Sequence, residues 1–347
     1  MKCIKNVSLL TGGGGRRLSG KSHVTASRPA KCGTGSAGGF TMAEILLSLT
    51  IIGVVAAITL PSLTGNINER TWNTQRKALY ARFSQAIALM PALNGYGTLD
   101  DTNDTAAETF VTAGLSKVLK INNICDSEHL ADCGIPAKIT TLDAKVLNDF
   151  TTSYKTLADF NNLFSGSAIE NEGVYEYHQQ NTKAAAFETA NGESILVYYN
   201  PYCTANEKPL NVYYLFMQPL MCANFIYDLN GKKGPNTVGK DIGFMAALYP
   251  SDSVVLAPMP LPEPSSYGAS SMPGAFCRKM NDETRTPGIN ELAVMFYNKR
   301  LLGDTHNGYF VSSELISPDR VWHFDMNVGC KHSNSINTGY RVWCVRR

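Results

Sequence analysis

The sequence has few of the residues and motifs that enzyme and metal sites use. It holds only six histidines among 347 residues. Neither Gly-x-Ser-x-Gly, His-Glu-x-x-His nor Cys-x-x-Cys occurs, so it offers no nucleophile elbow and no zinc-binding pattern. The histidines that follow the N-terminal region are scattered among polar neighbours: His129, His178, His306, His323 and His332. We therefore expect no catalytic residues and no enzymatic activity.

Acidic residues are absent from the first 39 positions, which hold seven lysines and arginines. Because the formal charge of the whole chain is +2, residues 40–347 carry a charge of −5. This acidic balance gives no support for nucleic-acid binding through bulk charge, and we expect no nucleic-acid partner. An apolar content of 44% excludes a disordered protein.

Long apolar runs are also rare, and only residues 40–60 reach the length of a bilayer crossing. As a helix, these 21 residues would span about 31 Å, close to the roughly 30 Å of a hydrocarbon core. Glu44 lies inside the run, where a carboxylate is costly and indicates a functional partner. With the basic segment before it, the run predicts a single-pass protein of the cytoplasmic membrane, with its N terminus inside and its head extracytoplasmic.

Gly39, Phe40, Glu44 and the apolar run that Pro61 follows resemble the N-terminal segment of the type IV pilin and type II secretion pseudopilin family. The resemblance covers about 50 residues. It implies that residues 1–39 are a leader, which prepilin peptidase, a membrane aspartic protease, removes after Gly39. It also implies N-methylation of Phe40 and an assembly role for Glu44, which would face the N-terminal amine of a neighbouring subunit.

The amine and the acid would neutralise each other between staggered helices and so set the axial register of a filament. The resemblance thus implies a structural subunit of a pilus-like filament or a secretion pseudopilus, found at the cell surface or in the periplasm after assembly. Its partners would be other pilin or pseudopilin subunits and an inner-membrane assembly platform with its ATPase. Pilus, pseudopilus and DNA-uptake filament share this segment, so the system stays open. The size of the head favours a minor or specialised subunit.

A second class of function stays open beside the first. In this alternative, the chain is a membrane-anchored envelope protein whose extracytoplasmic head binds a ligand or performs an unrecognised reaction. The apolar run would then act only as an anchor, and Glu44 would have no partner.

The chain divides into four expected regions. Residues 1–39 form the leader, residues 40–61 a transmembrane helix that becomes the filament core, and residues 62–90 its amphipathic continuation. Residues 91–347 form a globular head with variable loops. The amphipathic part places apolar side chains three, four or seven positions apart, which predicts one face packed on the head: Trp72, Leu79, Phe83, Ala86 and Met90.

Short runs rich in β-branched and aromatic residues predict strands at residues 194–199, 211–217 and 223–227. We also expect an amphipathic helix over residues 142–164 and a short helix over residues 289–302. The strands would place tyrosines alternately on one buried and one solvated face. The expected fold class is α+β and pilin-like: a long N-terminal helix, half membrane and half amphipathic, packed on a head with an antiparallel β-sheet.

A polar turn is the most distinctive stretch of the head. We use this name for residues 228–241, in which Asp228, Asn230, Asn236 and Asp241 carry side-chain oxygens. Such oxygens suit a hard cation such as calcium. The spacing is not that of an EF-hand, because the closing glutamate is missing. A metal-free turn and a calcium site both stay open, and we expect no other cofactor.

The nine cysteines are distributed unevenly, with two in the leader and seven after it. Outside the cytoplasm disulfides persist. We prefer three pairs by position along the chain, although sequence alone does not determine the connectivity. These are Cys125 with Cys133, Cys203 with Cys222 and Cys330 with Cys344, which leaves Cys277 over.

Overall fold

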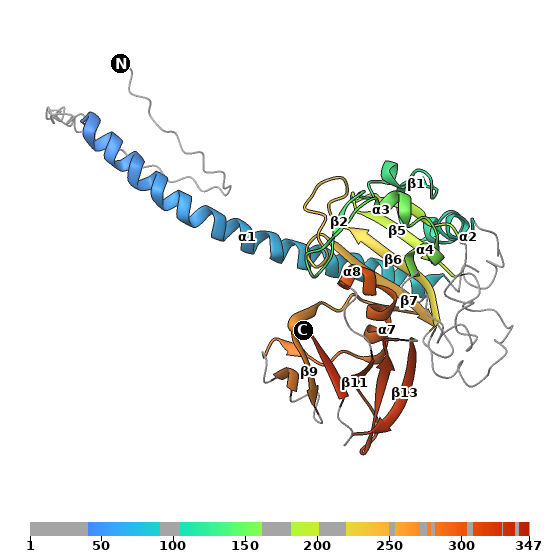
Figure 1. Cartoon of the computed structure of the whole chain (residues 1–347). Coiled ribbons are helices and arrows are strands. Elements are labelled where there is room, and N and C mark those ends of the chain that lie inside the picture. Colours follow the sequence, from blue (N-terminus) through green and yellow to red (C-terminus); the bar gives the residue numbers. More distant parts are fainter. Residues whose placement is uncertain are drawn as a thin grey trace, which may run out of the picture. The chain divides into compact units, whose positions relative to one another are not determined.

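The structure is a computed structural model of the chain (Figure 1), and it describes a large part of the sequence. The described residues are 41–90, 105–161, 182–200, 220–249, 254–270, 276–278, 282–303, 308–327, 329–336 and 340–346. The chain forms two compact units, Met1–Leu60 and Pro61–Arg347.

The helix α1 runs over Met42–Leu89 and includes Pro61. The described side chains of its first part, at residues 41–55 and 57, are all exposed. They include large apolar side chains that are between 44% and 80% exposed, such as Met42 and Ile45. This part of α1 therefore presents an apolar surface that no other described residue covers.

The core of the second unit is a six-stranded antiparallel sheet in the order β1-β4-β5-β6-β7-β8. Its strands are β1 (Ile121–Cys125), β4 (Ala185–Thr189), β5 (Ser194–Tyr199), β6 (Leu220–Asp228), β7 (Ile242–Tyr249) and β8 (Val255–Ala257). Strands β4 to β8 are sequential neighbours, so the sheet is a meander with β1 added at one edge. Turn residues such as Gly192, which has a φ of 84°, join the strands.

Helices cover both faces of this first sheet. Alternate residues of a strand point to opposite faces, and in β5 Ile195 and Val197 belong to one apolar cluster while Leu196 and Tyr198 belong to another. All six side chains of β5 are buried as a result. The sheet is thus the middle layer of three.

The C-terminal part of α1 packs on one of these faces. Leu79, Phe83 and Met90 are fully buried, and the Phe83 ring lies 5.3 Å from the ring of Phe225 and 6.2 Å from that of Phe187. Trp72 is partly buried against the same cluster. The helical spacing in residues 62–90 therefore predicted this face correctly. Next to α1, the same face is covered by α2 (Ala106–Thr109), η2 (Phe110–Gly114) and η3 (Leu115–Lys117).

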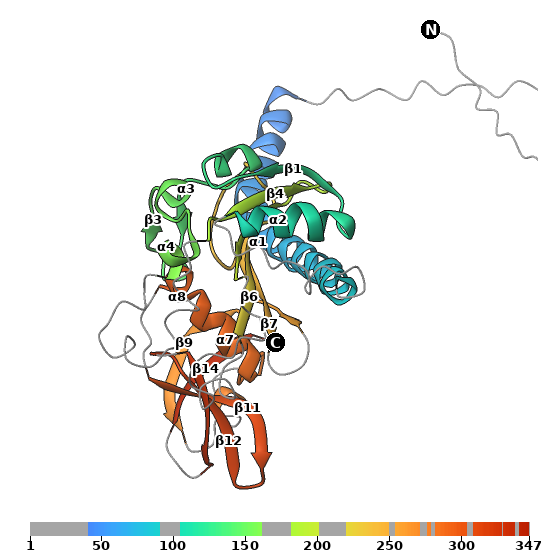
Figure 2. The same cartoon turned by 90° about the vertical axis from the view of Figure 1, so that its right-hand side faces the viewer.

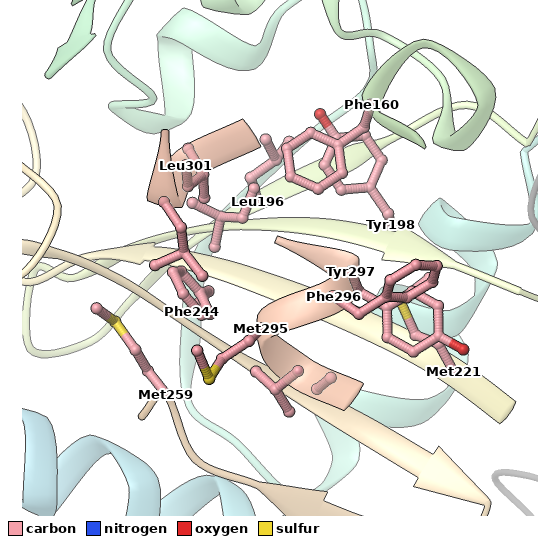
Figure 3. Close-up of a cluster of buried hydrophobic side chains, with 14 of the residues drawn as sticks. Phe160, Leu196, Tyr198, Met221, Phe244, Met259, Met295, Phe296, Tyr297 and Leu301 are labelled. Carbon is pink, nitrogen blue, oxygen red and sulfur yellow. The ribbon is translucent and has the colours of Figure 1, made fainter. Parts of the chain in front are cut away.

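The helices α7 (Ile289–Tyr297) and α8 (Lys299–Leu302) pack on the other face. Figure 3 shows Met295, Phe296 and Tyr297 of α7, with Leu301 of α8, gathered near Leu196 and other side chains of the sheet. The helix α4 (Leu157–Asn161) adds Phe160, whose ring stacks on Tyr198 at 4.7 Å.

One buried polar contact joins these two layers. The side-chain amides of Asn224 in β6 and Asn298, directly after α7, exchange two hydrogen bonds of 2.9 and 3.0 Å. Both residues are fully buried. The pair satisfies the polar groups of both side chains and fixes the end of α7 on the sheet.

A second sheet lies beyond α7. Its order is β10-β14-β11-β12-β13, and β9 also pairs with β14. Its strands are β9 (Pro262–Ser270), β10 (Thr284–Arg285), β11 (Tyr309–Ser317), β12 (Arg320–Asp325), β13 (Cys330–Ser335) and β14 (Tyr340–Arg346). Among the described strand pairs of this sheet, β11 and β14 are parallel and the others are antiparallel. Figure 2 shows α7 between β7 of the first sheet and β11 of the second, with which it makes contacts.

The remaining elements form a small layer beside the first sheet. The strands β2 (Ile139–Thr140) and β3 (Val146–Leu147) pair as a two-stranded sheet, η4 spans Leu130–Cys133, and α3 spans Phe150–Ser153.

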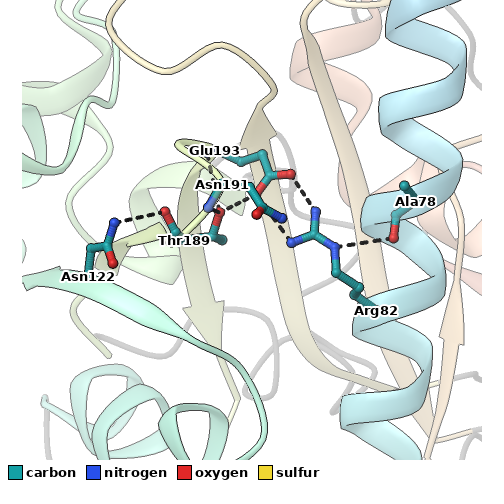
Figure 4. Close-up of polar contacts among 6 residues, drawn as sticks. All are labelled: Ala78, Arg82, Asn122, Thr189, Asn191 and Glu193. Atoms are coloured by element: carbon teal, nitrogen blue, oxygen red, sulfur yellow. Dashed lines mark hydrogen bonds and ion pairs between the residues drawn. The ribbon is translucent and has the colours of Figure 1, made fainter. Parts of the chain in front are cut away.

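An ion pair also joins α1 to the first sheet (Figure 4). Arg82 donates to the carboxylate of Glu193, which lies in the turn between β4 and β5 and is only 6% exposed. The hydroxyl of Thr189 donates to the same carboxylate. The buried acid therefore has partners on both the helix and the sheet, which limits its desolvation cost.

The fold class predicted from the sequence is wrong. The described residues of the head form two sheets of five or more strands and a small third sheet, with α7 and α8 between the large ones, and not one antiparallel sheet against one helix. Within the part of the chain whose side chains are described, no helix is both long and apolar enough to cross a membrane.

Two local predictions are also wrong. Residues 142–164 do not form one helix, because the described part divides into β3, α3 and α4. Tyr198 and Tyr199 were expected on one buried and one solvated face, but both are buried, since helices cover both faces of the sheet. The strand predicted at residues 211–217 lies outside the described residues.

We expect Phe83→Ala to lower the free energy of unfolding by about 3–5 kcal/mol, because it removes a fully buried ring from the contact between α1 and the sheet. Urea denaturation of the purified full-length protein measures this. Leu89→Ala is the matched control in the same helix, since Leu89 is 55% exposed and should change stability by no more than about 0.5 kcal/mol. Equal losses in the two variants would contradict the packing described here.

Candidate functional site

The first turn of α1 contains one of the predicted assembly residues, Glu44. Its carboxylate accepts hydrogen bonds from the backbone N–H of Thr41 at 2.9 Å and from the Thr41 hydroxyl at 3.0 Å. The Thr41 hydroxyl in turn accepts from the backbone N–H of Glu44 at 3.3 Å. This reciprocal arrangement is a capping box, which satisfies free N–H groups at a helix start. Glu44 therefore has a local structural role, and its side chain stays exposed.

The other processing and assembly residues are less fully described. Gly39 and Phe40 lie outside the described residues. Pro61 lies within α1, which does not end there but continues to Leu89. The assembly role expected of Pro61 stays a prediction.

The polar turn joins β6 to β7, two paired strands in which Asp228 faces Ile242 across the ladder. Asp241 holds the turn closed from within. Its carboxylate accepts the backbone N–H groups of Asn236 and Thr237 at 2.8 Å each and that of Ile242 at 3.2 Å. The positive φ values of Gly231, Asn236 and Gly239 turn the chain back towards β7.

The turn brings together the residues that the sequence proposed as cation ligands. Asp228 and Asp241 are 1% and 0% exposed. Three buried side-chain oxygens in the turn have no hydrogen-bond partner: Asp228 Oδ2, Asn230 Oδ1 and Asn236 Oδ1. Burial, together with the nearby charge of Asp241, raises the pKa of Asp228 to about 7. Buried polar atoms are normally paired, so three unpaired oxygens in one turn require an explanation.

The described residues offer no additional histidine or cysteine ligands beside the oxygens of the polar turn. Among the described residues, no group of three or more histidine, cysteine, aspartate or glutamate side chains is arranged to hold a metal ion. The polar turn brings two carboxylates and two amides together instead. Its ligand set is therefore made of oxygen atoms alone, which is the preference of calcium and magnesium and not of zinc.

Arg76 of α1 binds the far end of the polar turn. One of its guanidinium nitrogens donates to the backbone carbonyls of Gly239 at 3.0 Å and Lys240 at 2.8 Å. The other terminal nitrogen donates to Asn73 at 2.7 Å. The turn is thus attached to the helix that carries Glu44. Sequence reasoning missed this role of Arg76, because the two partners are more than 160 positions apart.

A cavity of about 930 Å³ lies next to this contact. Side chains of α1, of both large sheets and of the segment before β9 line it, among them Arg76, Tyr80, Tyr227, Met259 and Arg346. The Nε atom of Arg76 is buried and has no hydrogen-bond partner. The cavity mixes charged and apolar groups, and its volume is in the range of small-molecule sites.

Two of the histidines that look scattered in the sequence are neighbours in the second sheet. His323 in β12 faces His332 in β13, and their rings stack with centroids 5.5 Å apart. Burial, followed by the neighbouring His332, lowers the pKa of His323 to about 4. His323 is therefore neutral at physiological pH. The ring of Tyr309 lies near both, with centroids 5.3 Å from His323 and 6.0 Å from His332.

Disulfides connect cysteines in the head, and one predicted pair is confirmed. Cys125 and Cys133 are bonded, with their Cα atoms 6.0 Å apart. Cys277 bonds to Cys344, so the predicted pairing of Cys344 with Cys330 is wrong. The sheet explains the difference, because Cys277 and Cys344 share a small buried cluster with Val311, Val321 and Val342. Cys222 is also disulfide-bonded, and its predicted partner Cys203 lies outside the described residues.

Comparison with known protein families finds no family model that matches this chain, and no curated protein matches it either. The function must therefore be argued from the residues and the geometry of this chain alone.

We expect removal of the Cys277–Cys344 bond, which closes a loop of 67 residues, to lower the free energy of unfolding by about 4 kcal/mol. Removal of Cys125–Cys133, with a separation of only 8 residues, should lower it by about 2.5 kcal/mol. Urea denaturation of the two double-alanine variants measures the difference. Non-reducing peptide mapping of the native protein checks the pairing, and a Cys330–Cys344 peptide would contradict it.

Proposed function

We propose that this protein is a structural subunit of a pilus-like or pseudopilus filament, cleaved after Gly39 and assembled through the first part of α1. The observation that supports this most strongly is the segment Gly39-Phe40 with Glu44 and the apolar run behind it. The capping box places Glu44 in the first turn of α1 with its carboxylate exposed. Cleavage after Gly39 would create an amine at Phe40, four positions before this carboxylate.

The exposed apolar side chains of α1 support the same proposal. Between Met42 and Val55, large aliphatic groups are not covered by any of the described residues, and such exposure is costly in water. Packing against the same helix of other subunits removes this surface from water without any further element. Before assembly, the apolar run of residues 40–60 would hold the subunit in the cytoplasmic membrane. This run extends beyond the described side chains of α1.

The proposed partners follow from this arrangement. Prepilin peptidase would act on Gly39, and an inner-membrane platform with its ATPase would move the subunit into the filament. The head would then lie outside the cytoplasm, where its disulfides persist. One feature favours the alternative of a ligand-binding envelope protein, namely the cavity beside Arg76.

Substitution of Glu44 distinguishes a filament subunit from an envelope protein. It also distinguishes the effect of the Glu44 charge from that of its helix-capping hydrogen bonds. Glu44→Gln keeps a side chain that completes a capping box but removes the charge. Glu44→Ala removes both. If the carboxylate pairs with a neighbouring amine, both variants should be cleaved and should reach the membrane normally. Their incorporation into sheared filaments should fall at least about tenfold, which corresponds to a loss of about 1.4 kcal/mol per contact.

Glu69→Gln is the matched control, since it removes the same charge from the same helix. Quantitative immunoblotting of the filament fraction measures incorporation, and mass spectrometry of the mature protein should find a methylated Phe40 at the N terminus. Normal incorporation of Glu44→Gln would show that Glu44 acts only as a cap. Absence of the wild-type protein from the filament fraction would favour the envelope protein.

A further inference from the structure

We propose that the polar turn binds one divalent cation of the calcium type, with the side-chain oxygens of Asp228, Asn230 and Asn236 as ligands. These three residues provide the unpaired buried oxygens of the turn. The site does not depend on the filament proposal, because all of its residues belong to the head.

At Asn230 the hydrogen bonds determine which atom of the side-chain amide is the oxygen. Its amide nitrogen donates to the carbonyl of Gly234 at 3.0 Å, so the other amide atom must be the oxygen. That oxygen is buried and has no hydrogen-bond partner. At Asp228, Oδ1 accepts the backbone N–H of Asn230 at 3.1 Å, while Oδ2 remains unpaired. Each side chain is thus held by the backbone of the turn and leaves one oxygen without a hydrogen bond.

The charges of the turn also favour a cation. Asp228 and Asp241 are both buried, and the charge of Asp241 makes ionisation of Asp228 less favourable. None of the ion pairs found among the described residues includes either carboxylate. The nearby lysines Lys232, Lys233 and Lys240 are exposed. A water molecule would satisfy the three oxygens, but it would not offset the repulsion between two buried carboxylates.

Asp241 has a different role from the one that the sequence suggested. Its two oxygens already accept three backbone N–H groups, so it shapes the turn and contributes negative charge beside the cation. The direct ligands are then one carboxylate and two amides. Calcium accepts such mixed oxygen ligands in flexible geometry, with carbonyls and water in the remaining positions, whereas magnesium requires a near-ideal octahedron.

The cation would also stabilise the attachment of α1. Arg76 binds the carbonyls of Gly239 and Lys240, which lie between Asn236 and Asp241 at the end of the turn. A turn closed around a cation holds these two carbonyls in place. We therefore expect bound calcium to slow amide exchange both in residues 228–242 and in the part of α1 around Arg76.

Calcium binding to the full-length protein in detergent provides the test. After treatment with chelator, isothermal titration should show one calcium ion per chain, with weaker binding of magnesium. The melting temperature should rise with calcium and return to its starting value with excess chelator. Absence of both binding heat and a melting shift at about 1 mM calcium would overturn the proposal.

Asp228→Asn identifies the site. This variant keeps the shape of the side chain but removes one charge, so calcium affinity should fall at least about tenfold, because ligand charge sets the affinity of such sites. In chelator it should melt no lower than the wild type, since a buried charge is lost. Asp319→Asn is the matched control at an exposed turn, and it should bind calcium normally. An unchanged calcium response in Asp228→Asn would overturn the assignment of the ligands.

Hydrogen exchange measured by mass spectrometry tests the link to α1. Calcium should protect residues 228–242 and the segment around Arg76 in the wild type but not in Asp228→Asn. Protection limited to other parts of the chain would show that calcium binds elsewhere, which would also overturn the proposal.

Discussion

The burial of both faces of the first sheet is the constraint on which the rest of the head depends. A sheet with apolar side chains on both sides is stable in water only if something covers each side. In β5, Ile195 faces α1 while Leu196 faces α7 and α8, so both helical layers are required. The second sheet packs against α7 from the far side, and α7 is apolar almost all round. The layers therefore follow from one requirement, that no apolar strand face stays exposed.

Polar contacts then determine how the layers are placed. The buried amides of Asn224 and Asn298 connect β6 to the end of α7. Arg82 with Glu193, and Arg76 with the polar turn, connect α1 to the sheet at two places. Apolar packing alone would allow a helix to shift along the sheet. Each of these polar contacts forms only when the helix lies at one position on the sheet. The candidate cation site belongs to this second kind of contact, because it holds the turn to which Arg76 binds.

Sequence patterns predicted those structural features well that depend on residues close together in the chain. The spacing of Leu79, Phe83 and Met90 identified the buried face of α1, because helical periodicity alone decides which residues share a face. The range predicted for β5 is the range observed. The four oxygen-bearing residues of the polar turn lie in one loop of the sequence, so their proximity in the structure also has a local cause. Arg76 was not found, since its carbonyl partners come from a distant part of the chain.

By itself the sequence predicted a cleavage and assembly segment around Gly39 and Glu44. It also determined the amphipathic part of α1 and the composition of the polar turn, because each lies within a few helical turns or one loop. Only the tertiary structure decided that there are two large sheets, that Tyr198 and Tyr199 are both buried, and that Cys344 pairs with Cys277. It also decided which oxygens of the polar turn lack partners. The physical reason is that burial depends on what packs against a residue, and this comes from segments far away in the chain.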